Sequence, residues 1–233
     1  MHPADSRGLA EHGWLRSRHS FSFAGYHDPQ RIRFGALRVL NDDIVQGGMG
    51  FGEHPHDNME IVSIPLAGEL EHRDSMGNRA RIRKGDVQVM SAGTGIVHSE
   101  FNASAVEPVE FLQIWMFPNK RNVPPRYGQV TLAPEQIQDR LAQILSPDPD
   151  DEGVWVHQDA WFHMGNLAKG RQRAHRLKRP GNGIYAFVLS GSLTIEGHAL
   201  SDRDGLGITG MEEIGISVIS ESASLLLMEV PMN

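Results

Sequence analysis

Two short motifs hold the side chains of this sequence that are best suited to chemistry. The first is His54-Pro55-His56, and the second, further along the chain, is His98-Ser99-Glu100. Each motif places two ligand-type side chains two residues apart, and alternate residues of a β-strand point to the same face. If the two strands face one space, that space holds three imidazoles and one carboxylate. Such a ligand set suits one first-row divalent metal ion.

The composition excludes several other chemistries. The chain has 233 residues and no Cys, which rules out disulfides, thiolate metal ligands, iron–sulfur clusters and Cys nucleophiles. The formal net charge of −7 argues against direct binding of nucleic acid. The N-terminus has no apolar run of signal-peptide length, and no stretch approaches the roughly 20 apolar residues that span a membrane. We therefore expect a cytoplasmic protein without a membrane partner.

The elements that must position the two motifs are predicted to be β-strands. Short segments rich in Val, Ile, Leu and aromatic residues alternate with Gly and Asp at residues 34–45, 60–74, 79–90 and 109–117. Residues 74–78 have the composition of a turn between two strands. This pattern indicates an all-β sandwich or barrel.

The second half of the chain is predicted to be another β domain. Residues 118–127 are polar and rich in Pro, as in a linker. Residues 134–145 begin with Pro134, which suits a first helical position, and continue with one apolar stripe, which predicts a helix. Residues 184–200 then resemble residues 61–74, which indicates a degenerate internal repeat. We therefore expect two domains, residues 1–127 and 128–233.

The second copy lacks the metal motif. It contains no His-x-His, His175 stands alone in the sequence, and His198 aligns near His72 rather than near the histidine pair. One working site and one structural copy is the simplest interpretation.

The residues around both motifs resemble the cupin superfamily, and in particular its pirin family. Gly48, the histidine pair, Glu60 and Gly68 resemble the first cupin motif, and the stretch from Gly85 to His98 resembles the second. Ser91 replaces the usual Pro, and four residues rather than two separate Gly93 from His98. This departure resembles pirins, as do residues 19–26, 51–56, 72–78 and 111–115. The resemblance is strong up to Tyr127 and weaker beyond it, and it is greatest to bacterial pirin-like quercetin 2,3-dioxygenases.

The resemblance implies a bicupin, in which two β-barrels of the jelly-roll type face each other with few short helices. It also implies metal in the N-terminal barrel only, with His54, His56, His98 and Glu100 as ligands. Glu60 is then a structural carboxylate, and His72 is a histidine of the strand surface or of a polar network. The remaining histidines are expected to be ordinary polar residues: His19, His27, His157, His163, His175 and His198.

The implied activity is a metal-dependent dioxygenase reaction that opens the ring of a flavonol such as quercetin with O₂. Fe(II) is the expected metal because it supports O₂ chemistry, although Zn, Mn, Cu, Ni or Co would fit the same ligands. Glu100 would serve as ligand and proton acceptor. Phe51, Ile96 and Trp115 are candidates for the apolar pocket walls. Gln113 is expected to pack in the core or to orient a ligand.

Two other functions remain open from the sequence. Eukaryotic members of the family act as iron-containing, redox-sensing regulators through protein partners, and a cupin isomerase or hydrolase would use Zn or Mn without O₂. Repeated O₂ consumption with a phenolic substrate distinguishes the first function from both alternatives. Because a bicupin already contains two barrels in one chain, we expect a monomer.

Overall fold

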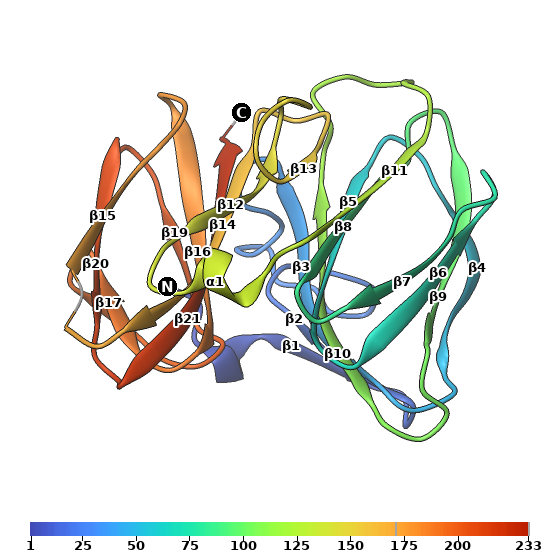
Figure 1. Ribbon diagram of the computed structural model, residues 1–233, viewed down its shortest axis with the longest axis horizontal. Coiled ribbons are helices and arrows are strands. Elements are labelled where there is room, and N and C mark those ends of the chain that lie inside the picture. The colour runs from blue at the N-terminus through green and yellow to red at the C-terminus, as the bar shows by residue number, and fades with distance from the viewer. Residues whose placement is uncertain (171, 233) are drawn as a thin grey trace.

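The protein consists of two β-barrels that lie side by side, as the computed structural model in Figure 1 shows. The structure describes residues 1–170 and 172–232. The N-terminal barrel runs from blue to green in Figure 1, and the C-terminal barrel runs from yellow to red. Each barrel combines one large sheet with one four-stranded sheet. The predicted all-β class is therefore confirmed.

The N-terminal barrel is built from eleven strands in two sheets. Its large sheet has the order β1-β2-β3-β10-β5-β8-β11, with bounds Gly8–Glu11, Leu15–His19, Leu37–Val45, Val109–Met116, Glu60–Ala67, Asp86–Ser91 and Arg126–Thr131. Its small sheet has the order β4-β9-β6-β7, with bounds Gly50–His56, Ile96–Asn102, Glu69–Asp74 and Arg79–Arg83. A short 3-10 helix, η1, precedes them at Ala4–Ser6.

The C-terminal barrel repeats this plan. Its large sheet has the order β13-β12-β14-β21-β16-β19, with bounds Val154–Trp155, Ala142–Ser146, Trp161–Ala168, Ser222–Pro231, Asn182–Ser190 and Gly205–Ile208. Its small sheet has the order β15-β20-β17-β18, with bounds Gln172–Arg176, Glu213–Val218, Leu193–Ile195 and His198–Leu200. The order β14-β21-β16-β19 matches β3-β10-β5-β8, and β15-β20-β17-β18 matches β4-β9-β6-β7. The predicted internal repeat is thus present in the topology.

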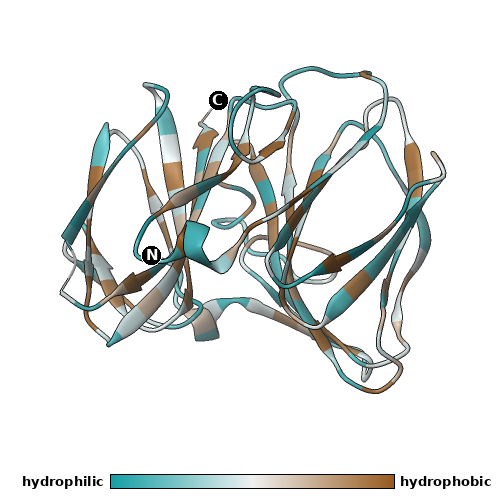
Figure 2. Cartoon of the chain, in the orientation of Figure 1, coloured by the Kyte–Doolittle hydropathy of each residue, from teal (hydrophilic) through white to brown (hydrophobic). Residues whose placement is uncertain are grey.

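The two large sheets are joined by one apolar core to which both barrels contribute. Leu40, Val62 and Ile114 come from the N-terminal sheet, and Phe162 and Tyr185 come from the C-terminal sheet. Figure 2 shows hydrophobic segments on the strands between the two barrels. Burying each large apolar side chain stabilises the fold by roughly 1.5–3 kcal/mol. Because this shared core stabilises both barrels, the residues inside the two barrels need not be the same.

Several local predictions can be compared with the elements. Asp74 accepts hydrogen bonds from the backbone N–H groups of Met76 (2.9 Å) and Asn78 (3.0 Å), so the predicted turn connects β6 and β7. The proposed boundary at residue 127 falls inside β11, which pairs with β8 of the N-terminal sheet. No helix among the described residues is long and apolar enough to cross a membrane.

The predicted helix over residues 134–145 is wrong for most of its length. The helix α1 covers only Pro134–Ile137, and Ala142–Ser146 forms β12 instead. Ile144 and Leu145 are fully buried in the shared core, and β12 pairs with β14. The adjacent apolar pair Ile144 and Leu145 fits a fully buried strand as well as a helix, and pairing with the sheet decided the outcome.

Candidate metal centre

Three of the four residues singled out from the sequence converge inside the N-terminal barrel. His54 on β4 lies directly opposite His98 on β9, and their ring centroids are 4.4 Å apart. His56 follows on the same face, with centroid distances of 4.8 Å to His54 and 5.0 Å to His98. Each ring offers a nitrogen, and these nitrogens lie within 4.8 Å of one another. The arrangement gives three imidazole donors to one point.

A β-bulge in β4 aims His54 at this point. Phe51 pairs with Glu100 and His54 pairs with His98, so β4 has one residue more than β9 over this stretch. The Nδ1 of His54 lies 2.7 Å from the carbonyl oxygen of Gly52. Because a carbonyl only accepts, Nδ1 must carry the proton, and the lone pair of Nε2 is left free. This is the tautomer that a metal ligand requires.

Burial keeps two of these rings in the form that can bind a cation. Burial, assisted by the neighbouring histidines, lowers the pKa of His98 to about 2. Burial and His54 lower the pKa of His56 to about 4. Both rings are therefore neutral at pH 7. Among the described residues, neither ring nitrogen of His98 nor Nε2 of His56 has a hydrogen-bond partner. Unpaired buried polar atoms cost stability, and a bound cation would satisfy these.

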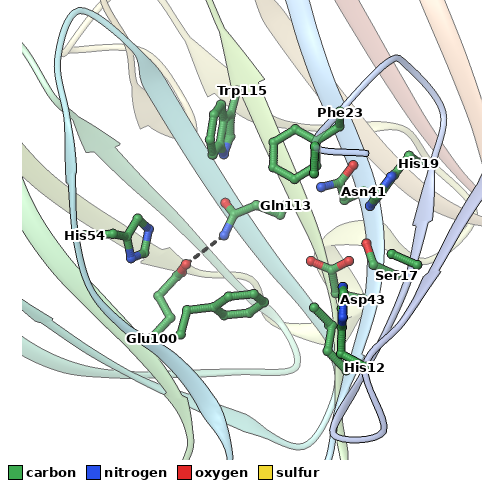
Figure 3. A pocket seen from close by; sticks show the side chains of 14 residues that line it. His12, Ser17, His19, Phe23, Asn41, Asp43, His54, Glu100, Gln113 and Trp115 are labelled. Atoms are coloured by element: carbon green, nitrogen blue, oxygen red, sulfur yellow. Dashed lines mark hydrogen bonds between the residues drawn. The ribbon is translucent and has the colours of Figure 1, made fainter. Parts of the chain in front are cut away.

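Glu100 is fully buried beside this group and is held by two hydrogen bonds. The Ser63 hydroxyl donates to Oε1 (2.9 Å) and the Gln113 amide donates to Oε2 (2.7 Å). A carboxylate oxygen of Glu100 lies within 4.8 Å of nitrogens of His72 and His98. Figure 3 shows Glu100 beside His54, with Gln113 bonded to it. Burial raises the pKa of Glu100. The hydrogen bonds from Ser63 and Gln113 and the neighbouring His72 and His54 act in the opposite direction and lower this pKa.

His72 is closer to the site than the sequence suggested. It is fully buried and lies opposite Glu100 in the β6–β9 register, so its expected place on the strand surface is wrong. Its Nε2 donates to Asp74 Oδ2 at 3.3 Å, which does make it part of a polar network. Its ring packs against His98 (5.4 Å) and Tyr127 (5.0 Å). Strand parity alone could not reveal this, because it requires the pairing of β6 with β9.

Other candidates fall into place around the site. Glu60 accepts hydrogen bonds at Oε2 from the Ser91 hydroxyl (2.7 Å) and the His157 backbone N–H (3.2 Å), as expected for a structural carboxylate. Gln113 binds Glu100 rather than packing only against apolar neighbours. Ile96 packs in a separate apolar cluster with Ile61.

A cavity of about 270 Å³ opens from His54 and Glu100 towards the N-terminal hairpin β1–β2. Phe51 and Trp115, two of the three expected wall residues, line it together with Phe23. Figure 3 shows polar side chains on the far side of the cavity: His12, Ser17, His19, Asn41 and Asp43. Of these, only His19 carried an expectation from the sequence, as an ordinary polar residue.

The comparisons with known proteins agree with this architecture. The Pirin family model matches residues 3–116, and the model of the quercetinase C-terminal cupin domain matches residues 143–230. The quercetin 2,3-dioxygenase of Escherichia coli strain K12 is 42% identical over 231 residues, covering 99% of this chain and 98% of that protein. A pirin-like protein of Caulobacter vibrioides is 36% identical over 228 residues, covering 97% of each chain.

A solved structure is similarly close. The crystal structure of the bacterial pirin YhhW from Escherichia coli in complex with nickel(II) superimposes with a TM-score of 0.93 at 41% sequence identity. The match covers 100% of this chain and 98% of that one.

Proposed function

Because the chain belongs to the pirin family, with the two cupin domains that the sequence predicted, we propose that it is a metal-dependent dioxygenase that opens a flavonol ring with O₂. The convergence of His54, His56 and His98 on one point beside an aromatic-walled cavity carries this proposal. The similarity to the quercetin 2,3-dioxygenase of Escherichia coli supports it. Quercetin is therefore the first substrate to test.

His54, His56, His98 and Glu100 would hold one divalent metal ion. The unpartnered nitrogens of His56 and His98 and the fixed tautomer of His54 fit a cation bound by imidazoles. Fe(II) is our choice for O₂ chemistry, whereas the related bacterial pirin is crystallised with nickel(II). When bound, the ion would lower the pKa of a coordinated flavonol hydroxyl and leave open positions for small ligands.

The chain's own residues would position and deprotonate the substrate. Glu100 is the proton acceptor for the flavonol hydroxyl, and the donors Ser63 and Gln113 hold its carboxylate in one orientation. Phe23, Phe51 and Trp115 form apolar walls, and Phe23 meets Trp115 edge to face with centroids 5.4 Å apart. Walls of this kind accept a flat ring and exclude water from it.

The test is quercetin-dependent O₂ uptake by protein loaded anaerobically with Fe(II), compared with the His98→Ala variant. We expect repeated turnovers in the wild type and none above background in the variant, with metal content measured in both. Full iron occupancy without turnover would contradict the dioxygenase function. That result would favour an iron-dependent regulatory protein or an O₂-independent reaction on the same ligands.

A further inference from the structure

The far side of the cavity carries a compact block of four polar side chains that the proposed reaction does not use. Strands β2 and β3 pair so that Ser17 lies opposite Asp43 and His19 lies opposite Asn41. All four residues are buried, with exposed fractions of 3–4%, and all four line the cavity. Figure 3 shows them across the cavity from His54 and Glu100.

Three atoms of this block lack a hydrogen-bond partner among the described residues. They are Asp43 Oδ1, Asn41 Oδ1 and His19 Nδ1. Leaving a buried polar atom unpaired costs roughly 1–3 kcal/mol, so such atoms are rare unless a ligand or water satisfies them. Two of the three are oxygens. Asn41 Oδ1 accepts a hydrogen bond, and Asp43 Oδ1 does so when its carboxyl is ionised, so both can be paired by a donor from outside the protein.

The fold itself does not require the carboxylate of Asp43. In the C-terminal barrel, β14 takes the place of β3, and β21 takes the place of β10. Asp43 pairs with Phe111 on β10, and the corresponding pair in the C-terminal barrel is Gly165 with Leu225 on β21. The same strand is thus built without a carboxylate, whereas the positions of Asn41 and His19 keep buried polar residues, His163 and Gln143. A buried carboxylate that the topology can omit is better explained by a ligand.

We propose that Asp43, with Asn41 and His19, is a specificity site that binds the hydroxyl groups of the substrate ring farthest from the metal-binding oxygens. This rests on the proposed function. For quercetin, those groups are the two adjacent hydroxyls of the pendant catechol ring, which donate to Asp43 Oδ1 and Asn41 Oδ1. The aromatic walls hold the flat body of the ligand between the two polar ends. The substrate class is therefore an aromatic compound with chelating oxygens at one end and hydroxyl donors at the other.

The experiment measures anaerobic binding to nickel-loaded protein, so that turnover plays no part. The probes are quercetin, its analogue without the two pendant-ring hydroxyls, and its analogue without the two hydroxyls of the fused benzene ring. All three keep the metal-binding 3-hydroxyl and 4-keto oxygens, and each is titrated by absorbance. In the wild type, we expect loss of the pendant hydroxyls to weaken binding about 10- to 100-fold, since buried acceptors are left unpaired. Loss of the fused-ring hydroxyls should change binding less than about threefold, because these groups do not meet the acceptors.

The variant Asp43→Ala should reduce the pendant-hydroxyl effect to within about threefold while metal content is retained, because the main acceptor is gone. Asp43→Asn serves if the alanine variant does not fold, and Glu110→Gln on β10, outside the cavity, is the control that keeps the wild-type ratio. An unchanged ratio in the Asp43 variants overturns the proposal, and so does a ratio near one in the wild type. Discrimination that follows the fused-ring hydroxyls instead also overturns it.

This design separates the inference from the proposed function. Wild-type protein that shows the binding ratio but consumes no O₂ supports the specificity site and contradicts the dioxygenase reaction. Wild-type protein that consumes O₂ but does not show the binding ratio supports the dioxygenase reaction and contradicts the specificity site.

Discussion

The interior of the N-terminal barrel is polar where that of the C-terminal barrel is apolar, although the strands of the two have the same order. Register identifies the corresponding positions. His54 faces His98, whereas His175 faces Ile214. The paired residues His72 and Glu100 correspond to Ile195 and Ile216. Gln113 and Ser63, which bind Glu100, correspond to Leu227 and Ala186.

The difference shows how few residues separate a site from a core. In the C-terminal barrel, the replacements join one large apolar cluster, which includes Ala186, Ile195, Ile214, Ile216 and Leu227. In the N-terminal barrel, the apolar residues of the interior split into two small clusters. The shared core between the large sheets stabilises both barrels. One interior can therefore carry buried polar groups that cost stability.

The largest effect is expected when His98 is replaced by Ile, the residue at the corresponding position 214 of the C-terminal barrel. His98→Ile removes the imidazole that lies opposite His54, so the metal should be lost. Turnover should fall about a thousandfold, because the metal supplies several kcal/mol of transition-state stabilisation. Metal content by plasma mass spectrometry and O₂ uptake check this.

The control is His198→Ile, at an exposed position on β18. It should keep both metal and turnover. A His98→Ile protein that still holds one metal ion per chain would remove His98 from the ligand set.

A smaller effect is expected from Gln113→Leu, again the residue of the other barrel. The variant loses the 2.7 Å hydrogen bond to Glu100 and leaves Oε2 of that carboxylate unpaired. Loss of such a supporting contact lowers metal affinity or activity about 10- to 100-fold. The matched control is Gln143→Leu in the C-terminal barrel, since Gln143 and Gln113 are equally buried at 8% exposure. Equal losses in both variants would contradict a specific role for Gln113.

The sequence predicts which residues lie together only where the pattern is local, within one strand. His54, His56, His98 and Glu100 could be found because i, i+2 spacing on a strand places side chains on one face whatever the strand pairs with. Asn41 and Asp43 have the same i, i+2 spacing, but His19 joins them only through the pairing of β2 with β3, which the sequence does not show.

One expected correspondence between the two halves of the chain was wrong. His198 aligned near His72, but it lies exposed on β18, and register places Ile195 opposite Ile216 as the counterpart of His72. Aligning Gly68 with Gly191 gives the same counterpart without a gap, since His72 and Ile195 each stand four residues after the glycine.

Buried carboxylates should make the N-terminal barrel sensitive to pH. Burial raises the pKa of Asp43 and of Glu60 to about 7 in each case. A carboxyl with a raised folded-state pKa binds protons in the folded state that the unfolded state has released. The free energy of unfolding of the metal-free protein should therefore fall as the pH rises from about 4 to about 7.

The variant Glu60→Gln tests this. Its amide oxygen can accept both hydrogen bonds that Oε2 accepts from Ser91 and His157. At pH 8 we expect an increase in stability of about 2–3 kcal/mol, or about 5–10 °C in Tm, and little change at pH 4. Thermal unfolding in the presence of a chelator measures it, with the exposed Glu135→Gln as control. A shift of the same size at both pH values would contradict a titrating Glu60.

The smallest effect is expected where the C-terminal barrel still resembles a site. His163 and His175 are buried with ring centroids 4.6 Å apart, a spacing within the 4.4–5.0 Å range of His54, His56 and His98. Burial lowers their pKa values to about 3 and about 4, so both rings are neutral at pH 7. The pair is thus chemically able to bind a metal ion, and only its surroundings differ.

Those surroundings argue against binding. His175 takes the place of His54 and His163 that of Asn41, whereas His98 and Glu100 correspond to Ile214 and Ile216. The charge of Lys178 acts on both rings. Two imidazoles that lie beside a cation and have no anionic ligand hold a divalent ion weakly. After saturation with nickel and gel filtration, His175→Ala should therefore still contain one metal ion per chain, and its turnover should lie within about twofold of the wild type. A fall from two bound ions to one would show that the apolar barrel also binds metal, and that His175 and His163 suffice without the residues that distinguish the two interiors.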